Sequence, residues 1–76
     1  MGRTKDEAVT EITNRAKAVG WRNVKVFIVE QPNAVGQPPL AIDLEGDHRG
    51  AHKRGSSNGF TVDEAADKML RYLGDP

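Results

Sequence analysis

The chain has 76 residues and no cysteine, and its 11 basic side chains balance 11 acidic ones. This length fits a single domain over residues 1–76, and the missing cysteines exclude disulfides and thiolate metal sites. Because its net charge is zero, the chain lacks the overall positive potential that is typical of dedicated nucleic-acid-binding proteins. The charged start is unlike a signal peptide, and the longest apolar run, residues 26–29, is far shorter than a membrane span. We therefore expect one cytoplasmic domain.

The first predicted element is a helix over residues 5–19. Thr4 and Glu7 have the three-residue spacing of a capping box, in which each side chain satisfies the other residue's backbone N–H. Apolar residues then recur every three or four positions, which is typical of a helix with one buried face. Gly20 suits the left-handed position that follows a helix end. The apolar residues of this stripe are Ala8, Val9, Ile12, Ala16 and Val19.

Two strands are predicted next, over residues 24–30 and 40–45. In the first, Val24, Val26 and Ile28 share one face, and the opposite face is partly apolar as well. In the second, apolar and polar residues alternate as in a half-buried strand. Residues 31–39 hold three of the four prolines, so they are predicted to form a long, stiffened loop between the strands.

Residues 46–59 carry a weaker pattern that leaves two interpretations open. Residues 48–54 can form a polar third strand after a turn at residues 45–48, or they can form a loop. Residues 55–59 have the sequence Gly-Ser-Ser-Asn-Gly, whose composition favours a flexible segment.

The last predicted element is an amphipathic helix that begins after Thr61. Glu64 again has the capping-box spacing, and Phe60 is placed for a hydrophobic staple. Gly74 is expected to end the helix. The fold class is therefore α+β, in the order α-β-β-(β)-α, with a small antiparallel sheet and both amphipathic helices packed on one face. The apolar stripe of this helix consists of Val62, Ala65, Ala66, Met69, Leu70 and Leu73.

This order of elements is similar to that of double-stranded-RNA-binding domains. In that family, the start of the last helix carries a lysine cluster that grips phosphates. The matching stretch here, residues 60–66, reads Phe-Thr-Val-Asp-Glu-Ala-Ala and is acidic where the family is basic. The resemblance therefore implies the layout of the fold and does not imply RNA binding.

No motif predicts a catalytic, metal or cofactor site. His48 and His52 are four residues apart, but on a strand they would lie about 13 Å apart, too far to share a metal ion. Ser56 and Ser57 lie in a Gly-rich stretch without a nucleophile-elbow motif, so we interpret them as turn residues. The alternating carboxylates of residues 43–47 are typical of a solvated strand face. We therefore expect a protein that is not an enzyme and has no cofactor.

One basic segment offers an alternative function. Such a cluster suits sequence-independent contacts to the phosphate backbone of a nucleic acid. It can equally protect an edge strand from pairing with another chain, because charged side chains block edge-to-edge association. The residues of this candidate site are His48, Arg49, His52, Lys53 and Arg54.

Several aromatic, apolar and proline residues form the candidate partner-binding surface. Stiff and aromatic side chains lose little entropy when they dock, which makes them good contact residues. Trp21 has a second interpretation, in which it covers the end of a thin core. The candidate residues are Trp21, Phe27, Val29, Val35, Pro38 and Pro39.

These observations favour a small, non-enzymatic protein-interaction module. We expect it to bind a larger protein partner as an inhibitor or adaptor, of a type common in phages and mobile elements. A homodimer through a sheet edge is a further option, and weak binding of nucleic acid through residues 48–54 is the alternative. No membrane partner is expected.

Overall fold

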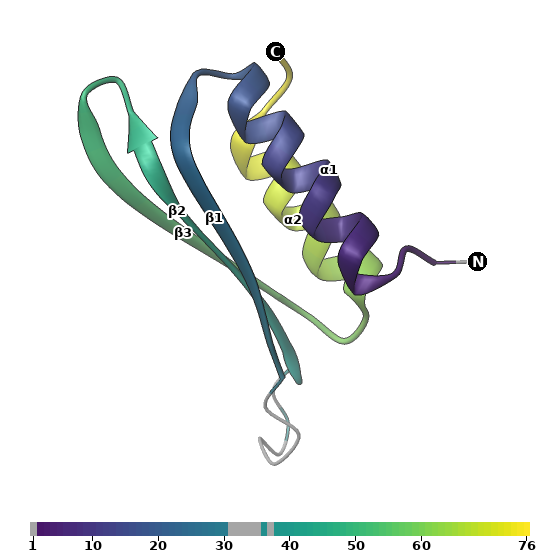
Figure 1. Ribbon diagram of the computed structural model, residues 1–76. Helices are drawn as coiled ribbons and strands as arrows, with labels where there is room; N and C mark the ends of the chain where they lie inside the picture. The colour runs from purple at the N-terminus through teal and green to yellow at the C-terminus, as the bar shows by residue number, and fades with distance from the viewer. Residues whose placement is uncertain (1, 31–35, 37) are drawn as a thin grey trace.

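The computed structural model of the chain describes residues 2–30, 36 and 38–76. Its elements are α1 (Lys5–Ala18), β1 (Trp21–Glu30), β2 (Leu40–His48), β3 (Ala51–Gly59) and α2 (Val62–Leu73). The three strands form one antiparallel sheet in the order β1-β2-β3. Both helices lie on the same face of this sheet (Figure 1). The predicted α+β fold is confirmed, including the third strand.

A capping box was predicted at the start of each helix. The structure contains both of its hydrogen bonds at α1 and only one of them at α2. At α1, the Glu7 N–H donates to Thr4 Oγ1 over 3.1 Å, and the Thr4 N–H donates to Glu7 Oε1 over 3.0 Å. The bond from the Thr4 N–H to the Glu7 carboxylate, followed by a contribution from the Thr4 side chain, lowers the pKa of Glu7, because both stabilise the charged carboxylate. At α2, the Glu64 N–H donates to Thr61 Oγ1 over 3.0 Å, but the Glu64 carboxylate pairs with Lys68. The second capping box is therefore only half formed.

The two helices run parallel and are tied to each other at both ends. Near their N-termini, the guanidinium of Arg3 contacts Asp63 and Asp67 of α2, each over 2.9 Å. Near their C-termini, Arg15 Nη1 donates to the carbonyl oxygen of Gly74 over 3.0 Å. Among the residues that the structure describes, neither helix has the length and apolar character needed to cross a bilayer.

The core lies between the two helices and one face of the sheet, which we call the inner face. Ile42 and Leu44 of the central strand are each only 1% exposed there. Because side chains alternate along a strand, the residues between them point to the opposite, outer face. The buried core consists of Ala8, Ile12, Ala16, Trp21, Ile42, Leu44, Ala65, Ala66 and Met69.

The region after β2 corrects two predictions. The turn lies at Arg49 and Gly50 and not at residues 45–48, because both residues adopt positive φ angles (53° and 78°) as a two-residue hairpin turn requires. Residues 55–59, predicted to be flexible, are part of β3 and pair with β2. The prediction rested on the glycine content of this segment. Two of these glycines are instead needed because α2 approaches the strand closely. A Cβ at Gly55 would lie 2.9 Å from the Tyr72 ring, and one at Gly59 would lie 2.6 Å from the Ala65 backbone nitrogen.

A bulge at the start of β1 corrects the place of Trp21. The register shifts between Arg22 and Lys25, and Asn23 has a positive φ of 54°. Trp21 and Val24 can therefore both face the core, although three positions separate them. The Trp21 ring is stacked on His48, with ring centroids 5.2 Å apart, and the Trp21 residue is only 5% exposed. The prediction that Trp21 covers the end of the core is confirmed, and its place on an exposed contact surface is wrong.

Candidate interaction surface

The outer face of the sheet is the face that neither helix covers (Figure 1). The strand register arranges its side chains in rows that cross the three strands. One row joins Phe27, Asp43 and Ser56, and the next joins Lys25, Glu45 and Arg54. The central strand β2 therefore places the carboxylates of Asp43 and Glu45 in the middle of this face, between side chains of β1 and β3.

The carboxylates of this face are engaged mainly by β3. Ser56 Oγ donates to Asp43 Oδ1 over 2.8 Å, and Arg54 Nε lies 3.3 Å from Glu45 Oε2. His52 lies between two acids, with Nδ1 3.4 Å from Asp47 and Nε2 3.6 Å from Glu45. These contacts offset negative charge on the β3 side of the face.

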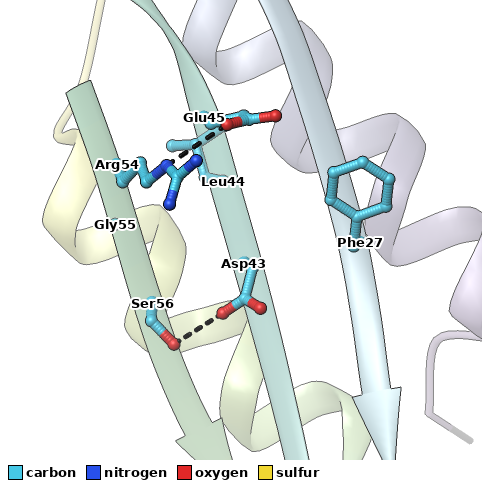
Figure 2. Close-up of a pocket in the computed structure, with 7 residues that line it drawn as sticks. All are labelled: Phe27, Asp43, Leu44, Glu45, Arg54, Gly55 and Ser56. Carbon is cyan, nitrogen blue, oxygen red and sulfur yellow. Dashed lines mark hydrogen bonds and ion pairs between the residues drawn. The ribbon is translucent and has the colours of Figure 1, made fainter. Parts of the chain in front are cut away.

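The β1 side of the outer face carries two exposed apolar residues in addition to Lys25. Phe27 is 52% exposed and Val29 is 37% exposed, although both are part of a regular strand. Figure 2 shows the Phe27 ring at one side of a shallow depression, with Asp43 and Ser56 across from it. An exposed aromatic ring beside a polar row combines an apolar contact with groups that can fix its orientation.

The predicted partner-binding residues are therefore divided. Phe27 and Val29 lie together on the outer face, whereas Trp21 is in the core. Pro38 and Pro39 are half-buried just before β2. Val35 lies outside the described residues.

The predicted nucleic-acid residues are also divided, because the hairpin turn falls inside the segment. His52 and Arg54 lie on the outer face and contact carboxylates there. His48 packs on Trp21, and its Nε2 lies 3.2 Å from the carbonyl oxygen of Val19. Arg49 lies in the turn, and Lys53 is an exposed residue of β3. Residues 48–54 therefore do not form one continuous basic surface.

The remaining polar candidates have structural contacts. Ser57 Oγ donates to the carbonyl oxygen of Ala65 over 2.8 Å, which links β3 to α2. His48 and His52 project to different faces of the hairpin, because they pair with Trp21 and Asp47 respectively. Within residues 2–30, 36 and 38–76, no three His, Cys, Asp or Glu side chains are placed to hold a metal ion together.

Asn23 is a structural residue that the sequence interpretation missed. Its Nδ2 donates to Asp47 Oδ2 over 2.9 Å from the β1 bulge. This bond is the main cause of a lowered pKa of Asp47, and the contact with His52 is the second cause, because both favour the charged carboxylate. The available signal was the residue type, since asparagine tolerates a positive φ better than most residues.

We expect Asn23→Gly to raise the pKa of Asp47 toward its ordinary value of 3.8. Glycine keeps the positive φ but removes the donor. In the wild type, the stabilisation from Asp47 is fully present above the unfolded-state pKa and is lost as the pH falls through the lower folded-state pKa. Carboxyl carbon shifts recorded by NMR between pH 2 and 7 would report this change. Asn14→Ala, on the exposed side of α1, should leave the pKa of Asp47 unchanged, and an unchanged value in Asn23→Gly would contradict the assignment.

No protein-family model matches the chain, and no curated protein matches it significantly. The geometry of the uncovered surface is therefore the basis of the functional proposal.

Proposed function

We propose that the chain is a non-enzymatic protein-interaction module that binds a larger protein through the outer face of its sheet. In this proposal it acts in the cytoplasm, as an inhibitor or adaptor of its partner. The observation that carries the proposal is the exposure of Phe27 and Val29 side by side on a face that neither helix covers. A regular strand gains no core burial from these side chains, whereas a docked partner would bury both.

The pattern around Phe27 supports a protein partner. Interfaces commonly place an aromatic residue near the centre and polar groups at the rim. Here, Asp43 and Ser56 lie across the sheet from Phe27, and Glu45 with Arg54 forms the next row. A partner that offers an apolar group to Phe27 and hydrogen-bond donors to the carboxylates would fit this arrangement.

The position of β1 also supports the proposal. β1 is an edge strand of ten residues, and in the described part of the chain it pairs with β2 alone. Its other edge can accept an additional strand from a partner. Phe27 and Val29 would then contact the added strand through their side chains, while backbone groups would supply hydrogen bonds.

A photo-crosslinking experiment tests the proposal. Benzoylphenylalanine is placed at Phe27, or at Tyr72 on α2 as a matched control that is 58% exposed. In cells that express the chain, we expect the position-27 variant to form a covalent adduct with one larger protein. The Phe27→Ala variant should then bind that purified partner about 30-fold more weakly, as removal of an aromatic contact worth about 2 kcal/mol predicts.

The control and the contradicting results are distinct. Tyr72→Ala should change the affinity by less than about threefold, because an exposed residue away from an interface contributes little. Equal adducts from positions 27 and 72, or no adduct from position 27, would contradict the proposal. An adduct of two copies of the chain would indicate a homodimer through the sheet and not a larger partner.

A further inference from the structure

The cationic side chains of the chain fall into two groups. Of the 11 lysines and arginines, five contact a carboxylate, namely Arg3, Lys5, Arg15, Arg54 and Lys68. The other six have no carboxylate within salt-bridge distance in the described part of the chain. Three of those six, Arg22, Arg49 and Lys53, line the end of the molecule formed by the β2–β3 turn. Free positive charge is therefore concentrated at this end.

Two shallow depressions shape this end of the molecule, which we call the hairpin end. Arg22 and Arg49 line one of them, and Arg49 and Lys53 line the other. His48 lines both, and the stacking of its ring on Trp21 fixes it in place. Arg22 lines only one depression and Lys53 only the other, whereas Arg49 of the turn lines both.

Two acidic residues, Asp47 and Asp75, line the same depressions, and each contacts a group other than the three cations. Asp47 accepts a hydrogen bond from Asn23 and contacts His52. Asp75 lies 3.4 Å from Arg15 Nη1 and is 95% exposed. Their negative charge is thus partly offset by groups other than Arg22, Arg49 and Lys53, which stay available for an anion.

We infer that the hairpin end binds the phosphate backbone of a nucleic-acid duplex through Arg22, Arg49 and Lys53. The three side chains are exposed and come from β1, the turn and β3. Because they are spread over three segments and no buried polar group joins them, they suit a row of phosphates better than one small anion. This site differs from the basic segment predicted from sequence, since it includes Arg22 and leaves out the paired Arg54 and His52. It is also separate from the apolar side of the outer face.

Fluorescence anisotropy with labelled duplexes tests this inference. Three phosphate contacts predict a slope of about −2.7 for the logarithm of affinity against the logarithm of salt concentration, or about 40-fold weaker binding at 200 than at 50 mM salt. DNA and RNA duplexes of the same sequence should bind within about threefold of each other, because the backbone carries the contact. No binding at 50 mM salt would overturn the inference.

Two triple variants with the same charge change identify the site. The first combines Arg22→Gln, Arg49→Asn and Lys53→Gln, and Arg49→Asn creates the Asn-Gly pair that this type of turn favours, so the hairpin is preserved. We expect this variant to lose binding at least tenfold at 50 mM salt and to show little salt dependence. The matched control combines Lys17→Gln, Lys25→Gln and Arg71→Gln, which are the other unpaired cations, and should bind within about threefold of the wild type. Equal loss in both variants would show a nonspecific charge effect and would overturn the site. The Phe27→Ala variant should bind duplexes normally, so this result is independent of the protein-binding proposal.

Discussion

The Ile42→Ala variant is expected to lose on the order of 2–5 kcal/mol of unfolding free energy. Ile42 is 1% exposed at the centre of β2, where it faces the helix layer. Its truncation removes apolar contacts and leaves a cavity that a sheet strand held on both sides cannot readily close. A chain of this length is expected to have a total stability of roughly 4–11 kcal/mol. The loss expected from truncating the Ile42 side chain is therefore a large share of the total stability.

Urea denaturation followed by circular dichroism measures this effect. The matched control is Val29→Ala, which shortens another β-branched residue but lies 37% exposed on the outer face. Its cost should stay below about 1 kcal/mol, in line with surface substitutions. A similar loss in both variants would show that the core does not lie on the inner face as described.

The Gly59→Ala variant is expected to destabilise the fold by roughly 1–3 kcal/mol, through overpacking and not through lost contacts. A Cβ at this position would lie 2.6 Å from the Ala65 backbone nitrogen and 3.0 Å from Glu64 Cβ. The closest neighbour is backbone of the first turns of α2, so the whole helix would have to shift outward. The φ angle of Gly59 is not positive, and the expected cost is therefore steric.

Gly55→Ala provides the comparison that separates steric crowding at backbone from crowding at a side chain. Its Cβ would lie 2.9 Å from the Tyr72 ring, which is the exposed end of a side chain and can rotate away. We expect a smaller loss than for Gly59→Ala in the same urea titration. Amide shifts in residues 62–66 should change strongly only in Gly59→Ala. Equal losses for the two variants would contradict the close approach of β3 and α2.

The helices and the first two strands could be predicted because their local signals agree with their burial. The Thr4 capping box and the three- and four-residue apolar spacing predicted α1 to within one residue of its end at Ala18. The alternation of Leu40, Ile42 and Leu44 predicted which face of β2 meets the core. In these elements, the same side chains that favour the local conformation also make the tertiary contacts.

The polar strand and the bulge could not be predicted because their causes lie elsewhere in the chain. The sequence of residues 55–59 is typical of a flexible loop. In the fold, α2 packs so closely against Gly55 and Gly59 that a larger side chain at either position would meet it. The bulge at Asn23 brings its side chain to Asp47, which lies 24 residues away in the sequence. No window of neighbouring residues contains that information.

The candidate surface was predicted in part. Phe27 and Val29 were identified from the second apolar face of β1, and their exposure agrees with the predicted location. The bulge moved Trp21 from the candidate surface into the core, and the turn at Arg49 divided the basic segment. Arg22 was not part of the predicted basic segment, and only the sheet register, which pairs it with Asp47, places it at the hairpin end. Its role in binding, like that of Phe27, stays a prediction.

The parallel pairing of the two helices has a consequence for the order of folding. The strands are consecutive, so each hairpin closes over a short stretch of chain, whereas the Arg3–Asp63 contact joins residues 60 positions apart. Closing a longer loop costs more entropy, and distant contacts tend to slow folding. We expect the three-stranded meander to precede the α1–α2 contact in the folding transition state. The rate of unfolding would then depend on this helix pair more than the rate of folding does.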